Sequence, residues 1–146
     1  MKKKFIFLWL LPLFVLGQDQ TKNYISVGFL DHKTGNSIIG YTRSVIQNEN
    51  NELFIGFGSA VAINSFIIGY KKYLLRSSID GYSVISIQKI YGMGGDLSAP
   101  CASIGIEKRI WKILFLNIGI NSTMRFSSSQ EIEFITLPTL NLNIRY

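Results

Sequence analysis

From Tyr24 to Tyr146, large apolar side chains alternate with small or polar ones in run after run, and this alternation constrains the fold most strongly. Successive side chains of a β-strand point to opposite faces, so each run predicts a strand with one apolar and one polar face. Turn-forming stretches such as HKTGN, NENN, RSSIDG, GMGGDLSA and SSSQE separate the runs. Short strands at this spacing predict an all-β barrel or sandwich. The eight expected strands are 23–31, 37–47, 52–61, 64–75, 82–91, 100–109, 112–126 and 133–146.

The polar face of these strands is unusually rich in glycine. A strand face in water should carry residues such as Lys, Glu and Thr, because glycine weakens a strand interior. The interior of an eight-stranded barrel, in contrast, is just wide enough for side chains to fill, so some inward positions must be small. The glycine-rich face would then point inward and the apolar face outward into lipid. The pattern therefore predicts an eight-stranded antiparallel up-and-down transmembrane β-barrel.

The N-terminal stretch MKKKFIFLWLLPLFVLGQDQ combines three lysines, an apolar run from Phe5 to Leu16, and a small residue, Gly17. This is the order of regions in a secretory signal peptide, and the apolar run is shorter than the roughly 20 residues of a membrane-spanning helix. We expect residues 1–17 to be a cleaved signal peptide. Residues 18–146, about 129 in number, would form a single barrel domain.

The net charge and the cysteine content argue against nucleic-acid-binding proteins and small disulfide-linked folds. The chain has a net charge of +6. Removal of the signal peptide lowers this to about +3, and no Lys/Arg cluster suggests binding to nucleic acid. Cys101 is the only cysteine, so the small disulfide-linked extracellular folds are excluded as well.

The last strand ends in LNLNIRY, with Leu140, Leu142, Ile144 and Tyr146 on one face. Together with the signal peptide and the alternation, this ending resembles the small outer-membrane β-barrel proteins of the Gram-negative type. The resemblance implies residence in the cell outer membrane, contact with its lipid, and recognition of these four residues by the barrel-assembly machinery. Pro138 within the last strand and the short external loops depart from the family pattern.

Five charged residues fall on the face assigned to the interior. Charges in a confined interior must be paired or hydrated, because burying an isolated charge is costly. We therefore expect an ion-pair network inside the barrel, with little room left for a conduction pathway. The residues are Lys71, Glu107, Arg109, Glu133 and Arg145.

Sequence motifs for catalysis, cofactors or metals are weak. His32 is the only histidine, and we expect it to be a solvated loop residue. Some outer-membrane barrels modify lipid A with a histidine, a serine and an acidic residue, but Ser77, Ser78 and Asp80 are expected on the opposite side of the membrane from His32. We predict a non-enzymatic barrel of structural or envelope-interaction role without a cofactor. The alternatives are an exported soluble β-barrel that binds an apolar ligand and, less favoured, a lipid A-modifying enzyme.

Overall fold

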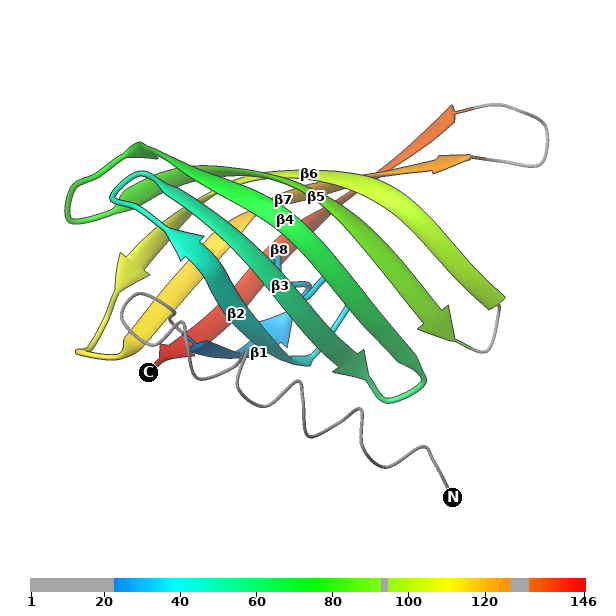
Figure 1. Ribbon diagram of the computed structural model, residues 1–146, viewed down its shortest axis with the longest axis horizontal. Coiled ribbons are helices and arrows are strands. Elements are labelled where there is room, and N and C mark those ends of the chain that lie inside the picture. The colour runs from blue at the N-terminus through cyan, green and yellow to red at the C-terminus, as the bar shows by residue number, and fades with distance from the viewer. Residues whose placement is uncertain (1–22, 93–94, 127–131) are drawn as a thin grey trace, which may run out of the picture.

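The computed structural model describes residues 23–92, 95–126 and 132–146, and these form a closed antiparallel barrel of eight strands (Figure 1). The expected signal peptide and the SSSQE connector lie outside the described residues. Each strand pairs with its neighbours in sequence, and β1 closes the barrel against β8. The strands are β1 (Asn23–Phe29), β2 (Ile39–Gln47), β3 (Asn51–Ala60), β4 (Ile63–Leu75), β5 (Asp80–Gly92), β6 (Gly95–Arg109), β7 (Leu114–Phe126) and β8 (Ile132–Arg145).

Both ends of the described chain lie at the same end of the barrel. The backbone N–H of Asn23 donates to the carbonyl of Tyr146 at 3.0 Å, and the reverse hydrogen bond has the same length. The connections 48–50, 76–79 and 110–113 lie at this end, which we call the terminus end. We call the opposite end, where β1, β3, β5 and β7 finish, the loop end.

The two faces of the wall are divided as the alternation predicts. On β5, Ile85 and Ile87 are 70% and 67% exposed on the outer surface, whereas Ser86 between them is 4% exposed. Inward positions of the other strands are similarly small or polar. A few apolar and aromatic side chains also lie inside and form one small cluster: Phe54, Ile67, Tyr73, Tyr82 and Val84. The barrel is therefore polar inside and apolar outside, opposite to a soluble domain with an apolar core.

The start of β6 differs most from the sequence prediction, and β1 is two residues shorter than expected. β1 ends at Phe29 rather than at residue 31, because the chain leaves the wall there. β6 begins at Gly95 rather than at residue 100, because its ladder with β5 continues to the Gly92–Gly95 pair. Much of the expected GMGGDLSA connector is therefore strand. The other boundaries lie within two residues of the prediction.

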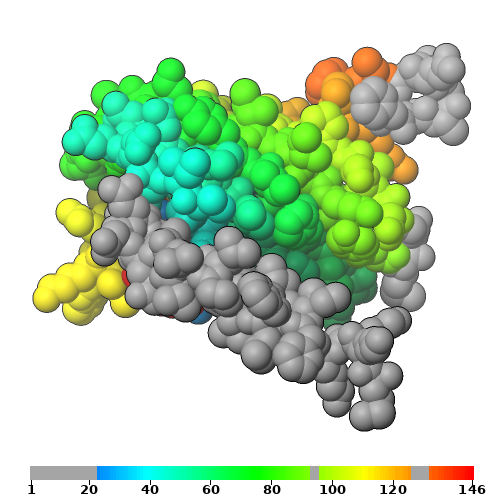
Figure 2. Space-filling model, viewed as in Figure 1, coloured from blue at the N-terminus to red at the C-terminus, as the bar shows by residue number. Residues whose placement is uncertain are grey.

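The wall is not equally high all round. β1 has 7 residues and β2 has 9, whereas β6 and β8 have 15 and 14. The far ends of β7 and β8, in orange, project beyond the rest of the barrel at the loop end (Figure 2). β1 pairs with β8 only as far as the Phe29–Leu140 pair. Pro138 lies beyond that pair, where a proline is tolerated because β1 no longer needs its N–H.

Candidate functional site

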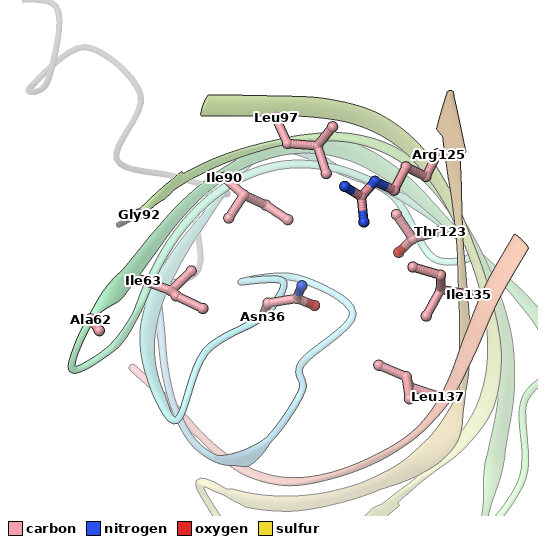
Figure 3. A pocket seen from close by; sticks show the side chains of 10 residues that line it. All are labelled: Asn36, Ala62, Ile63, Ile90, Gly92, Leu97, Thr123, Arg125, Ile135 and Leu137. Atoms are coloured by element: carbon pink, nitrogen blue, oxygen red, sulfur yellow. The ribbon is translucent and has the colours of Figure 1, made fainter. Parts of the chain in front are cut away.

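The segment between β1 and β2, residues 30–38, folds into the barrel, and we call it the plug loop. Figure 3 shows this pale blue loop, which carries Asn36, inside the ring of strands. At its start Leu30 has a φ of 53°, in the left-handed region that non-glycine residues rarely adopt. The N–H of Asp31 donates to the carbonyl of Gly35 at 3.0 Å, and a reverse bond of 2.6 Å completes a tight hairpin. All residues from 30 to 35 are buried.

Side chains of the plug loop hold its hairpin in shape. The Asp31 carboxylate accepts hydrogen bonds from the backbone N–H of Lys33 at 3.1 Å and from the Thr34 hydroxyl at 3.3 Å. The Thr34 hydroxyl also lies 2.7 Å from that of Ser37 and 3.3 Å from that of Ser26 in β1. Short polar side chains favour turns by such local bonds. The composition of HKTGN therefore indicates a turn, but it does not indicate that the turn folds into the barrel.

Three inward glycines of β2 and β3 form the surface on which the plug loop rests. A Cβ atom at Gly56 would lie 1.8 Å from the carbonyl oxygen of Lys33. Cβ atoms at Gly40 and Gly58 would lie 2.4 Å and 2.5 Å from atoms of Thr34. These distances leave no room for any side chain. The inward glycines that indicated a crowded lumen are therefore needed to admit a loop of the same chain.

A buried ion pair joins the plug loop to the wall. Nζ of Lys33 lies 2.6 Å from Oε1 of Glu52 on β3, and both side chains are at most 1% exposed. The same ammonium group is 3.8 Å from the ring centroid of Tyr24, close enough for a cation–π interaction. The hydroxyl of Ser44 also donates to Glu52. The charge of Lys33 is thus compensated on several sides, as burial requires.

A second buried network lies toward the terminus end and contains three of the five charged residues expected inside. Nζ of Lys71 is 3.0 Å from Oε2 of Glu107, and the guanidinium of Arg145 pairs with Oε1 of the same carboxylate. The hydroxyl of Tyr73 donates to Oε1 at 3.3 Å. The ammonium of Lys71 also lies 4.1 Å from the ring centroid of Tyr82. One carboxylate therefore holds two cations from β4 and β8.

The structure does not bring the other two expected residues into this network. Arg109 is exposed at the terminus end, where it lines a cavity of about 550 Å³ together with Arg76 and Asp80. Glu133 is exposed near the loop end, opposite Arg125 in the β7–β8 ladder. Alternation along a strand identifies the inward face, but it does not indicate how far along the barrel each residue lies.

The expectation that His32 is a solvated loop residue is wrong, because the plug loop buries it to 1% exposure. Its Nδ1 lies 3.2 Å from a carboxylate oxygen of Asp31 and 3.2 Å from the hydroxyl of Tyr82. Burial lowers the pKa of His32 well below its ordinary value of 6.5, and the nearby cations Lys71 and Lys33 lower it further. His32 is therefore a neutral side chain that packs inside the barrel.

Serines near His32 in sequence or weighed as its partners make other contacts. Ser37, in the plug loop, bonds to Thr34, and the hydroxyl of Ser77, at the terminus end, donates to the carbonyl of Ile79 at 2.9 Å. Among residues 23–92, 95–126 and 132–146, the side chains within hydrogen-bonding distance of His32 are Asp31 and Tyr82, an acid and a phenol. Nucleophilic catalysis needs a nucleophile within hydrogen-bond reach of its base, and this arrangement supplies no serine there.

The four residues of the terminal motif lie together on the outer surface of β8 and just after it. Leu140, Leu142 and Ile144 alternate with the buried or half-buried Thr139, Asn141, Asn143 and Arg145. Tyr146 is exposed as well. The structure thus gives these side chains a common outward face.

A second cavity, of about 540 Å³, lies inside the barrel mouth at the loop end, and we call it the mouth cavity (Figure 3). Inward side chains of β4 to β8 surround it, and Asn36 of the plug loop contributes from the centre. The sequence analysis missed it, although the inward positions of several strands change from polar to apolar toward this end. The lining residues are Asn36, Ala62, Ile63, Ile90, Gly92, Leu97, Thr123, Arg125, Ile135 and Leu137.

Within the described parts of the chain, no three or more His, Cys, Asp or Glu side chains are grouped so that they could hold a metal ion. Cys101 is a buried free thiol, 3.4 Å from the hydroxyl of Thr123. No helix among the described residues is long and apolar enough to cross a membrane.

Comparison with known proteins does not assign the chain to a family. No protein-family model matches the sequence, and no curated protein matches it significantly. Its function must therefore be argued from the barrel itself.

Proposed function

We propose that this chain is an integral outer-membrane β-barrel with a structural or envelope-interaction role and without catalytic activity. The observation that carries the proposal is the inverted distribution of side chains, with large apolar residues exposed outside and polar and charged residues buried inside. Exposed apolar area on this scale is rare in a soluble monomer, whereas lipid would cover it favourably. Up to the Phe29–Leu140 pair, closure of the ladder between β1 and β8 satisfies backbone groups that a hydrocarbon environment would leave unpaired.

The proposed role is that of a closed barrel rather than a channel. The plug loop, its ion pair to Glu52 and the Lys71–Glu107–Arg145 network occupy the lumen between the two ends. An eight-stranded barrel has little interior space beyond what side chains fill. The expected partners are outer-membrane lipid and, during biogenesis, the barrel-assembly machinery. The latter would read Leu140, Leu142, Ile144 and Tyr146, as the family resemblance implies.

Cell fractionation tests the proposal. The full-length chain, expressed in a Gram-negative host, should pellet with outer membranes and should resist extraction by high salt or carbonate. After detergent extraction, it should migrate differently on a gel before and after boiling, as a closed barrel that unfolds only on heating. Recovery in the soluble periplasmic fraction without detergent would contradict the proposal.

The soluble alternative, an exported barrel that binds an apolar ligand, is favoured by one observation, the mouth cavity. It predicts a monomer that stays dispersed in buffer without detergent, despite its exposed outer residues. The enzymatic alternative predicts release or transfer of acyl chains from lipid A by the purified barrel. Loss of such an activity in His32→Ala, with the fold retained, would contradict the non-catalytic role.

A further inference from the structure

The mouth cavity differs chemically from the rest of the lumen. On β5 the inward side chain changes from the buried Gln88 to Ile90, and on β8 it changes from Leu137 to the buried Thr139. Ile63, Leu97 and Ile135 extend the same apolar lining around the ring (Figure 3). A mouth that only met water would not need bulky apolar side chains on its inner face. Its volume lies within the range of small-molecule binding pockets, about 300–1,000 Å³.

The polar groups of the cavity are few, and one of them is a cation. Thr123 directs its hydroxyl to the thiol of Cys101, 3.4 Å away, and Asn36 belongs to the plug loop. Arg125 is exposed, and no ion pair links it to any other residue of the described ranges, although Glu133 faces it across the ladder. Figure 3 shows its guanidinium beside the apolar side chains. An apolar cavity bordered by one arginine is complementary to an apolar chain with an anionic head group.

The wall beside the cavity is incomplete on one side. β8 continues for eight residues beyond its last pair with β1, from Thr139 back to Ile132, with a ladder to β7 alone. Leu137 and Ile135, which line the cavity, belong to this stretch. β1 has left the wall at this height to become the plug loop. A chain-like ligand could thus pass along the free edge of β8 between the outer surface and the cavity.

We infer that the mouth cavity binds a single-chain anionic amphiphile of the fatty-acid class, with its acyl chain among Ile90, Leu97 and Leu137 and its carboxylate at Arg125. The route of entry from lipid rests on the proposed membrane location. The cavity itself is a feature of the barrel and does not rest on that proposal. The plug loop forms the floor that stops the chain from passing farther into the lumen. The bound ligand would be a resident or sensed amphiphile, not a reactant.

The test uses the full barrel refolded into phosphatidylcholine vesicles and a palmitic acid analogue that carries a photoreactive diazirine near its methyl end. After illumination, mass spectrometry of peptides locates the adducts. Outward residues such as Ile85 and Ile104 report contact with the bilayer, and inward residues such as Ile90, Leu97 and Leu137 report entry into the cavity. We expect adducts on both groups.

Two experiments test whether the cavity recognises the carboxylate. The first replaces the photoreactive acid by the alcohol of the same chain length, which requires no mutation, and the second uses the variant Arg125→Gln. Inward labelling should fall about fivefold in either case, the effect of an exposed charge pair worth about 1 kcal/mol. Arg109→Gln, which removes an exposed arginine at the other end of the barrel, is the matched control and should leave inward labelling unchanged. Ile90→Trp, which fills the cavity, should abolish inward labelling but preserve outward labelling.

Absence of inward adducts while outward residues are labelled would overturn the inference and leave the membrane proposal intact. Equal inward labelling by acid and alcohol would also overturn it, since any apolar chain would then suffice. Inward adducts without outward ones would support the cavity but contradict the membrane setting. The two proposals therefore fail in distinguishable ways.

Discussion

The part of the lumen that holds the plug loop and the mouth above it share strands β4, β5 and β8 but differ in their chemistry. Around the loop, many inward side chains are polar or absent, and two of the polar ones bond to the loop: Ser65 donates to the carbonyl of Thr34, and Asn141 donates to that of Leu30 at 3.4 Å. Above the loop, most inward side chains are aliphatic. A buried loop brings backbone polar groups that need partners, whereas an empty mouth brings none. The polarity of each stretch of wall therefore follows from what that stretch faces.

The largest effect should come from breaking the charge network below the loop. Glu107→Ala leaves the buried Lys71 and the half-buried Arg145 without their shared carboxylate, which should lower the free energy of unfolding by about 3–5 kcal/mol. Urea unfolding of the refolded barrel measures the change. Asp80→Ala removes the partly exposed pair with Arg76 and an exposed hydrogen bond from the N–H of Ser77, and it should cost only about 1 kcal/mol. Equal losses in the two variants would show that the network is not insulated from water.

The two regions should also differ in their tolerance of added volume. At Gly56 a methyl group would clash with the backbone of Lys33, so Gly56→Ala should cost about 3 kcal/mol or displace the plug loop. Gly92→Ala, at the mouth, is the matched control because its Cβ would come no closer than 3.4 Å to any neighbour. Urea unfolding and hydrogen exchange of residues 30–38 measure the two effects. Similar behaviour of the variants would contradict the seating of the loop.

Acidification should weaken the plugged region through His32. Its pKa is lowered in the folded state, so below about pH 6.5 the unfolded chain binds the proton that the folded chain excludes. The stability should therefore decrease as the pH falls below about 6.5. The control is His32→Gln, which lacks the titrating imidazole. This variant keeps the buried charged neighbours Asp31, Lys33, Lys71 and Glu107. Parallel pH profiles of unfolding for wild type and variant would contradict the buried neutral histidine.

The smallest effect should come from one hydrogen bond to the plug loop. Asn141→Ala removes the donor to the carbonyl of Leu30 and should cost about 1 kcal/mol. Thr136→Ala, on the same strand as Asn141, removes an exposed hydroxyl contact with Ser122 of β7 and should change stability by less than about 0.5 kcal/mol. Thermal or urea unfolding distinguishes these values. A larger loss for Thr136→Ala would indicate that β8 is stabilised chiefly above the loop.

The barrel and its sidedness could be predicted from the sequence because the side chains of a strand alternate with a period of two. Ile85, Ser86 and Ile87 show the pattern and take the expected faces. Three of the five expected network residues meet because they share the inward face and a common height. Arg109 and Glu133 share the face but lie at the two ends, and alternation contains no information about height.

The plug loop could not be predicted because its sequence, DHKTGN, is that of an ordinary exposed turn. The information lies elsewhere in the chain, in the glycines Gly40, Gly56 and Gly58 that leave room for it. Gly56 and Gly58 lie more than 20 residues from Lys33 and Thr34 in the sequence, so only the closed barrel reveals these contacts. The burial of His32 and the mouth cavity could not be predicted for the same reason, because both depend on contacts between strands of the closed barrel.

The most direct test of the central claim is the environment of the outer surface. Spin labels placed singly at Ile85, Ile104 and Leu142, in a Cys101→Ser background, would face outward from β5, β6 and β8. A label at Arg109, exposed at the terminus end, is the aqueous control. In vesicles, the three outward labels should be accessible to oxygen and protected from a water-soluble nickel complex, whereas the label at 109 should show the reverse. Accessibility of the outward labels to the nickel complex at the level of the control would contradict a membrane-embedded barrel.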